Sequence, residues 1–310
     1  MRMNDTSTKD AVVFPGQGSQ FPGMADPWML HPAGRAVIDE ASDALGRDVA
    51  SGCHDEALLA TTEFVQPALL ACGMAAFRVL QAEGAGFLGA AGHSLGEFAA
   101  LVAADVLDLA DALDVVVIRG RAMQRAGEER PGTMAALLGT DVEQAVTLCQ
   151  DARGDDVLVV ANENSPAQVV ISGSVPAVER ASSLAAERKI RAVRLNVAGA
   201  FHSPLMEPAV APIVERLSSI AFRIPAFPIA ENVVGALVAD PAELRELLGR
   251  QVVSPVRWMG CARALAAAGA VTFVEAGPGE VLTKLAKRVV PEARAVAIGS
   301  PEAAGAFLSA

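Results

Sequence analysis

Residues 87–104 read FLGAAGHSLGEFAALVAA, and this stretch decides the fold. The apolar run of residues 87–91 is typical of a short buried strand, and the turn of residues 92–96 leads into a helix over residues 97–104. The turn has the pattern G-x-S-x-G in the context that the pattern requires, a strand before it and a helix after it. Small residues on both sides of Ser94 avoid backbone clashes in so tight a turn. We therefore predict that Ser94 is a nucleophile held above the edge of a sheet.

Similar alternations occur before and after this stretch. An apolar run at residues 11–14 stops at Pro15-Gly16 and enters a glycine-rich loop. Further helices are predicted over residues 36–45, 67–83, 111–126, 204–217, 241–251 and 257–268, and further strands over residues 228–230 and 271–275. The alternation predicts an α/β-hydrolase-like domain with a mainly parallel sheet.

The middle of the chain has a different order of elements. Strands are predicted over residues 133–138, 157–161, 168–172 and 191–197, and helices over residues 142–149 and 175–187. The order β-α-β-β-α-β is that of a ferredoxin-like unit. We predict a ferredoxin-like small domain at residues 133–198, inserted into a catalytic domain made of residues 1–132 and 199–310.

Composition excludes several classes of protein. The 310 residues carry a formal net charge of −11, which argues against a nucleic-acid-binding protein and requires that an acidic partner meet a local basic patch. The four cysteines have no metal-site or redox spacing, which favours reduced thiols in a cytoplasmic protein. The polar stretch MRMNDTSTKD does not resemble a signal peptide, and no apolar run approaches the ~18 residues of a membrane span. We expect a soluble, cytoplasmic monomer that needs no cofactor and binds neither nucleic acid nor membrane.

A serine nucleophile needs a base, and the chain has only four histidines. His31 and His54 lie in polar, loop-like stretches. His93 adjoins the nucleophile, and we expect it to shape the turn with its side chain pointing away from the reactive side. His202 follows a predicted strand and precedes a helix, where loop-borne catalytic groups usually lie. By elimination, His202 is the predicted base.

Arg119 lies on an otherwise apolar face of the helix predicted at residues 111–126. Two interpretations remain open from the sequence. The side chain either covers apolar surface with its stem and ends in solvent, or it is buried and binds a carboxylate through its planar fork of donors.

These motifs together resemble the malonyl-CoA:acyl carrier protein transacylases and the acyltransferase domains of polyketide and fatty acid synthases. The resemblance covers residues 11–288. It rests on these segments: VFPGQGSQ at 13–20, QPALL at 66–70, GHSLGE at 92–97, RGR at 119–121, NENSP at 162–166, GAFHS at 199–203, Gln251 before SPV at 254–256, and EAGPG at 275–279.

The resemblance implies a role for each matching residue. Ser94 attacks the thioester of a coenzyme A substrate, and His202, oriented by a backbone carbonyl near Gln251, moves the proton. The amides of Gln17 and Leu95 form the oxyanion hole. Arg119 binds the free carboxylate of the malonyl group. Asn162 contacts the pantetheine arm or lines the cleft between the domains.

Selectivity depends on Phe201, which would crowd the α-carbon of the acyl group. In the family, members with Ala-Phe-His at this position are associated with malonyl as the acyl group, whereas members selective for methylmalonyl tend to have Ala-Ser-His. One methyl group is worth only ~1–3 kcal/mol, so this is a preference. Phe98 and Val65 depart from the family's usual Tyr and Thr, and we expect Phe98 to remove a hydroxyl near the entrance.

The expected partner is an acidic acyl carrier protein, which needs a cationic docking face. Two basic groups are candidates, although each is also explained as a solvated charge run: Lys284, Lys287 and Arg288 at helical spacing, and the small-domain group with Lys189 and Arg191.

Three alternatives to malonyl transfer remain. The first is a transferase for another acyl group, such as methylmalonyl, ethylmalonyl or a carrier-bound chain. The second is a thioester hydrolase, and the third is a non-catalytic scaffold that binds carrier proteins. The sequence is compatible with service in fatty acid or in polyketide synthesis.

Overall fold

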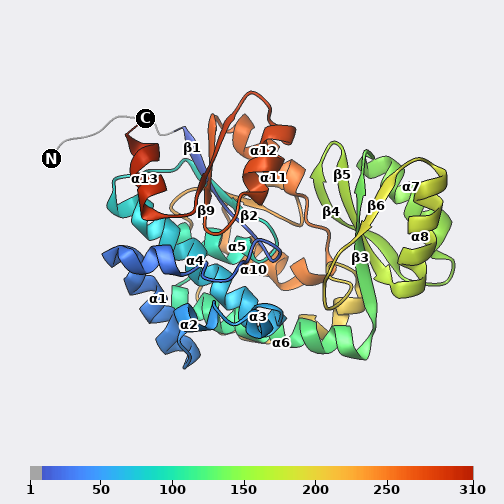
Figure 1. Ribbon diagram of the computed structural model, residues 1–310, viewed down its shortest axis with the longest axis horizontal. Helices are drawn as coiled ribbons and strands as arrows, with labels where there is room; N and C mark the ends of the chain where they lie inside the picture. The colour runs from blue at the N-terminus through green and yellow to red at the C-terminus, as the bar shows by residue number, and fades with distance from the viewer. Residues whose placement is uncertain (1–8, 310) are drawn as a thin grey trace.

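The computed structural model describes residues 9–309 (Figure 1). Residues 1–8 and 310 lie outside the described residues, and with them most of the polar leader on which the absence of a signal peptide was predicted. The larger of two sheets has the strand order β10-β9-β1-β2-β7-β8. Its strands are β1 (Asp10–Phe14), β2 (Gly89–Gly92), β7 (Ile229–Glu231), β8 (Ala236–Val238), β9 (Thr272–Ala276) and β10 (Arg294–Ile298). All neighbours are parallel except β7 and β8, which confirms the predicted α/β fold with a mainly parallel sheet.

Strand β1 is central because both of its faces are covered. Val12 and Phe14 pack into one apolar cluster, while Ala11 and Val13 pack into another on the opposite face. Successive side chains of a strand point to opposite faces, so a strand between two helical layers must be apolar at every position. This explains the uninterrupted apolar run that predicted the strand.

Helices cover both faces of this sheet (Figure 1). The α-helices are α1 (Pro32–Leu45), α2 (Val49–Gly52), α3 (Glu56–Leu59), α4 (Thr62–Ala82), α5 (Gly96–Ala103), α6 (Leu109–Glu129), α9 (Val210–Ser218), α10 (Pro241–Arg250), α11 (Trp258–Ala267), α12 (Val281–Val289) and α13 (Pro301–Leu308). Three 3-10 helices accompany them: η1 (Asp26–Leu30), η2 (Pro204–Ala209) and η3 (Gln251–Val253).

The small domain is built on a separate antiparallel sheet with the order β4-β5-β3-β6. Its elements are β3 (Gly132–Leu138), α7 (Val142–Arg153), β4 (Leu158–Ser165), β5 (Gln168–Ser174), α8 (Val175–Glu187) and β6 (Arg191–Arg194). Both helices pack on one face and close a core of their own. The topology is ferredoxin-like, as predicted; the boundaries at residues 133 and 198 stay a prediction.

A short stretch of backbone pairing joins the two sheets' domains. Asn162 of β4 forms a parallel bridge with Val256, which precedes α11. The Glu163 amide donates to the Val256 carbonyl oxygen at 2.9 Å, and the Val256 amide donates to the Ala161 carbonyl oxygen at 2.8 Å. Strand β4 is therefore held to the large domain by main-chain hydrogen bonds.

Helix α4 differs from its prediction in two ways. It begins at Thr62, not at Pro67, because the Thr61 side chain caps it by accepting from the Phe64 amide. The helix is also long and apolar enough to cross a membrane, contrary to our count of apolar runs, yet 89% of its apolar window is buried inside the protein. It is therefore a core helix of the large domain.

Proline and missing sequence signals explain the other differences. The helix predicted over residues 204–217 is divided into η2 and α9, because Pro208 has no amide hydrogen to donate. Strand β6 ends at Arg194 and not at residue 197. Strands β8 and β10 and helix α13 were not predicted.

Candidate active site

The predicted nucleophile sits on a strained turn between β2 and α5. Ser94 has φ of 52°, in the left-handed region that non-glycine residues rarely adopt. The turn is possible only because its flanking residues lack side chains: a Cβ on Gly92 would lie 1.9 Å from the Gly96 carbonyl carbon, and a Cβ on Gly96 would lie 2.1 Å from the Phe14 carbonyl oxygen. The glycines thus let the turn close against β1 while Ser94 projects above the sheet.

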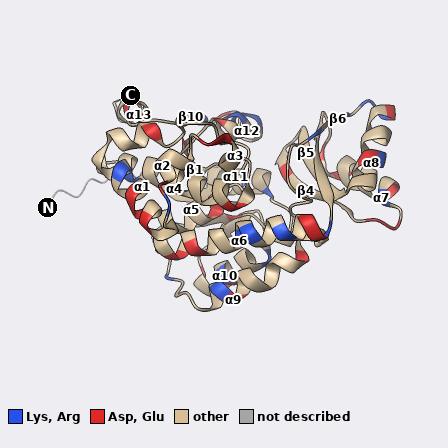
Figure 2. Cartoon of the chain, turned by 60° about the horizontal axis from the view of Figure 1, so that its bottom comes forward, with Lys and Arg blue, Asp and Glu red and all other residues tan. Residues whose placement is uncertain are grey.

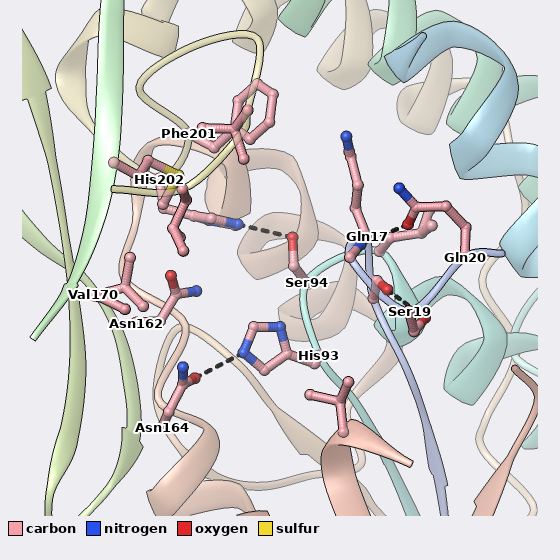
Figure 3. Close-up of a pocket in the computed structure, with 18 of the residues that line it drawn as sticks. Gln17, Ser19, Gln20, His93, Ser94, Asn162, Asn164, Val170, Phe201 and His202 are labelled. Atoms are coloured by element: carbon pink, nitrogen blue, oxygen red, sulfur yellow. Dashed lines mark hydrogen bonds between the residues drawn. The ribbon is translucent and has the colours of Figure 1, made fainter. Parts of the chain in front are cut away.

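His202 reaches Ser94 from a segment 108 residues away. The Ser94 hydroxyl lies 2.7 Å from His202 Nε2 (Figure 3). On the other side of the ring, Nδ1 lies 3.0 Å from the Gln251 carbonyl oxygen and 3.1 Å from that of Ser254. Two acceptors at Nδ1 assign the proton to that nitrogen and leave Nε2 as the acceptor for the serine proton. Two main-chain carbonyl groups therefore orient the imidazole, and no carboxylate of residues 9–309 is hydrogen-bonded to it.

His202 is neutral in the free protein. The side chain is 4% exposed, and burial together with the nearby positive charge of Arg119 lowers its pKa to about 3. Both effects disfavour the imidazolium ion. The ring is consequently unprotonated at Nε2 at neutral pH and ready to accept a proton.

Arg119 is buried beside the same hydroxyl, so the interpretation as a surface arginine is wrong. It is 1% exposed and donates to Ser94 Oγ at 3.0 Å, to Gln251 Oε1 at 3.0 Å and to Gln66 Oε1 at 2.8 Å. All three acceptors are neutral. Within residues 9–309 the Arg119 Nε has no acceptor. The site thus holds a guanidinium group with donor capacity to spare and no ion pair, which is an incomplete arrangement for a buried charge.

The electrostatics of Arg119 keep it cationic. Burial lowers its pKa to about 10, which still leaves the guanidinium charged at neutral pH. The Phe98 ring packs against the guanidinium at 5.8 Å and is fully buried. Phe98 therefore lies beneath the site and not near its entrance, contrary to our expectation. The missing hydroxyl affects the surroundings of Arg119.

These residues line a cavity of about 270 Å³ between the two sheets (Figure 3). Gln17 contributes from the loop after β1 and Leu95 from the start of α5. Within the described part of the chain neither backbone amide has an acceptor, so both are available to hold an oxyanion. Phe201 lines the same cavity and is 6% exposed.

The small domain supplies the opposite wall. Asn162 and Asn164 of β4 both line the cavity, and Asn164 Oδ1 lies 2.9 Å from His93 Nε2 (Figure 3). His93 therefore points into the cavity and links the two domains, whereas we predicted that it points away. Of the other histidines, His31 caps α1 and His54 contacts Asp26 on the surface.

Sequence reasoning missed two residues that hold the site together. Asn232 Oδ1 accepts from the Ser94 amide at 2.7 Å, and its Nδ2 donates to the Gly92 carbonyl oxygen at 2.7 Å. Gln66 is 1% exposed and positions Arg119. A signal was present for each: Asn232 follows the carboxyl end of a buried parallel strand, and Gln66 lies within the apolar stretch of residues 64–77 of α4.

The candidate docking residues flank the cavity. Helix α12, which carries Lys284, Lys287 and Arg288, also contributes Val281, Leu282 and Leu285 to the cavity wall. Its basic segment is visible in blue on the large domain (Figure 2). Strand β6 carries Arg191, and the residues after it line the cavity from the small domain.

The surroundings of these cations differ. Lys284 forms an ion pair with Glu280 at 2.6 Å. In the part of the chain that the structure describes, no carboxylate lies within ion-pair distance of Lys287, Arg288, Lys189 or Arg191. These four positions are therefore the ones available to an acidic partner.

Fold and site together define a class. A serine on a strand–turn–helix, a neutral imidazole and a buried arginine without a counter-ion suit acyl transfer through a serine ester. The sequence matches the Acyl transferase domain family over residues 11–304, and the chain belongs to this family.

Known relatives narrow the class. The chain is 41% identical over 309 residues to the malonyl CoA-acyl carrier protein transacylase of Escherichia coli (strain K12), an alignment that covers 97% of this chain and 99% of that protein. It superposes on the crystal structure of the malonyl-CoA:acyl carrier protein transacylase of Xanthomonas oryzae pv. oryzae with a TM-score of 0.94 at 40% identity, covering 98% of each chain. A malonyl-transacylase solved in complex with a type II PKS acyl-carrier protein gives a TM-score of 0.94 at 37% identity and covers 97% of this chain and 99% of that one.

Proposed function

We propose that this protein transfers a malonyl group, or a closely related dicarboxylic acyl group, from coenzyme A to the phosphopantetheine thiol of an acyl carrier protein. The observation that carries the proposal is the single cluster of Ser94, His202 and Arg119, with 2.7 Å between hydroxyl and imidazole and 3.0 Å between guanidinium and hydroxyl. The near-full-length similarity to malonyl transacylases supports the same substrate class.

In the first half-reaction, Ser94 Oγ attacks the thioester carbonyl carbon while His202 Nε2 takes the hydroxyl proton. The oxygen of the tetrahedral intermediate is stabilised by the amides of Gln17 and Leu95. The carbon–sulfur bond then breaks, and the coenzyme A sulfur leaves with the proton from His202. In the second half-reaction, His202 takes the proton of the carrier thiol, whose sulfur attacks the ester, and Ser94 recovers its proton.

Arg119 binds the free carboxylate of the acyl group in this proposal. The guanidinium already faces Ser94 Oγ and has an Nε without an acceptor among the described residues, so a carboxylate supplies both a charge partner and a further acceptor. The chemistry uses side chains and main-chain amides of one chain and the energy of the thioester, which supports action as a monomer without a cofactor. The four cysteines are buried free thiols, which is compatible with a cytoplasmic location.

Intact-protein mass spectrometry after incubation with a panel of acyl-CoA substrates tests the proposal. We expect a stable malonyl adduct on Ser94 that disappears on addition of holo carrier protein and is absent from Ser94→Ala. Turnover to free malonate without carrier protein would instead identify a hydrolase. A preferred adduct with methylmalonyl, ethylmalonyl or a longer chain would assign a different acyl group.

The carrier protein is proposed to dock across the mouth of the cavity, on Lys287 and Arg288 of α12 and on Arg191 and Lys189 of the small domain. The double variant Lys287→Glu/Arg288→Glu is expected to raise the KM for carrier protein while leaving acylation by malonyl-CoA and the slow hydrolysis of acyl-Ser94 unchanged.

A matched control reverses two exposed charges, Arg35 and Arg47, at the end of the large domain that carries α1 (Figure 1). This control should change neither the KM for carrier protein nor the rate of hydrolysis of acyl-Ser94. Equal effects of the α12 variant on carrier transfer and on hydrolysis would reject the docking role.

A further inference from the structure

Two buried glutamates lie directly behind the Ser94 turn and take no part in the chemistry described above. Glu97 is in the first turn of α5 and is 1% exposed, and Glu231 ends β7 and is fully buried. Burial and their mutual repulsion disfavour two negative charges at this place. The pKa of Glu97 lies well above its usual value, first because of burial and then because of the charge of Glu231.

The hydrogen bonds decide which glutamate carries the charge. Glu231 Oε2 accepts from the amides of Val233 at 2.8 Å and Val234 at 3.0 Å, which stabilises a carboxylate. Its second oxygen, Oε1, is buried without a donor among the described residues. Glu97 accepts from one main-chain amide, that of Asn232, 2.9 Å from Oε2, and its other hydrogen-bonding partners are the side chains of Gln251 and Glu231. Because the two carboxyl groups are also hydrogen-bonded to each other, a proton on Glu97 supplies the donor that Glu231 Oε1 lacks.

The same residues lead to the nucleophile. Glu97 accepts from the Asn232 backbone amide, and the Asn232 side chain accepts from the Ser94 amide and donates to Gly92. These bonds hold the left-handed Ser94 backbone. Asn232 is fully buried, so its place depends on these partners.

We propose that Glu97 is a positioning residue: its protonated carboxyl group donates to Glu231, accepts from the Asn232 amide, and so holds Asn232 where it fixes the Ser94 main chain. The pair thereby carries one proton and one negative charge. The role rests on acylation of Ser94, the proposed function, but the protonation state does not.

The other ionisable groups near the pair are on three neighbouring elements. Arg119 of α6 lies close to Glu97, and Arg250, at the end of α10, favours the charged form of Glu231. Burial raises the pKa of the Cys261 thiol of α11, which lies close to both glutamates. Loss of the shared proton at alkaline pH would place two negative charges behind the turn, and acylation should then slow.

Infrared difference spectroscopy tests the protonation state directly. The spectrum of the wild-type protein minus that of Glu97→Gln at neutral pH should contain the C=O stretching band of a protonated carboxyl group. Glu275, a third buried glutamate with a raised pKa, is common to both proteins and cancels. Absence of the band from the difference spectrum, or its loss only in Glu231→Gln, would overturn the proposal.

Single-turnover acylation by malonyl-CoA tests the positioning role. Glutamine offers a donor and an acceptor in the places of a protonated glutamate, so Glu97→Gln should acylate within about threefold of the wild-type rate. Glu97→Leu removes both bonds and should acylate about 10- to 100-fold more slowly, with little change in the KM for malonyl-CoA, because displacement of a nucleophile by a fraction of an ångström is costly.

Wild-type acylation by Glu97→Leu, or an equal loss in Glu97→Gln and Glu97→Leu, would refute the role. Thermal melting checks that each variant is folded; if the leucine variant is not, the glutamine variant and its spectrum decide. Failure of the wild-type protein to form any adduct would reject the proposed function and leave the infrared result standing.

Discussion

Replacement of Arg119 by methionine removes the positive charge and keeps most of the side-chain volume. In the free protein the three lost hydrogen bonds end on neutral acceptors, Gln66, Gln251 and Ser94. Gln251 still donates to the Ser94 carbonyl oxygen at 3.0 Å, so we expect the turn to persist. The effect should therefore fall on substrates that place a carboxylate at this position.

The magnitude follows from leaving that carboxylate buried without its partner. Removal of one member of a buried charge pair costs about 3–5 kcal/mol. At 1.36 kcal/mol for each factor of ten, kcat/KM for malonyl-CoA should fall about 10²- to 10⁴-fold. Acetyl-CoA has no carboxylate, so acetylation of Ser94 should be retained or increased.

The assay compares acylation rates with malonyl-CoA and acetyl-CoA by intact-protein mass spectrometry. Arg121→Met is the matched control, because Arg121 lies on the same helix, has a side chain that is 64% exposed and pairs with Glu63 on the surface, an interaction worth at most about 1 kcal/mol. Unchanged malonyl kinetics in Arg119→Met, or equal losses with both substrates, would refute the carboxylate role.

Three further outcomes are expected. Because burial and the Arg119 charge lower the pKa of His202 to about 3, kcat/KM of the wild-type protein should stay level as the pH falls from 6 to about 5. Arg119→Met should raise this pKa and move the acid limb of the pH profile toward neutral pH. An acid limb near pH 6.5 in the wild-type protein would contradict this. Phe201→Ser enlarges the cavity beside His202 and should raise the preference for methylmalonyl over malonyl by an amount worth ~1–3 kcal/mol, measured by mass spectrometry with the two acyl-CoA substrates in competition. An unchanged ratio of the two Ser94 adducts would count against the steric role. Gly92→Ala places a Cβ 1.9 Å from the Gly96 carbonyl carbon, so the variant should lose the native turn. We expect a lower melting temperature and no Ser94 adduct. A melting temperature and an acylation rate equal to those of the wild-type protein would show that the turn has room for a side chain.

The sequence predicted the parts of the fold that have a local signal. The strand at β1 and the helix at α8 follow from apolar periodicity, and the Ser94 turn follows from its glycines. Helix α4 was misplaced at its start because Pro67 looked like a helix start, while the true start depends on the Thr61 cap. Strand β10 was not predicted, although residues 295–298 read AVAI; so short an apolar run does not by itself distinguish a strand from a buried helical turn.

In the site, the sequence pointed to the groups that we propose react and missed the groups that hold them. Ser94 and His202 belong to recognisable segments, and their separation of 2.7 Å agrees with the pairing that was predicted. Asn232 and the carboxyl pair of Glu97 and Glu231 act through hydrogen bonds between residues more than 130 positions apart. Such contacts depend on how strands β2 and β7 are paired, which single-sequence patterns do not specify.

The main-chain pairing of β4 with Val256 has a consequence for the order of events. These main-chain hydrogen bonds tie one wall of the cavity to the large domain and limit how far the two domains can separate at this place. Under the proposed function, a long slender arm must then slide in lengthwise, acyl end first. Since the thioester donor and the thiol acceptor carry the same arm, both use the same entrance to the cavity. The coenzyme A product must therefore leave before the arm of the carrier protein can enter.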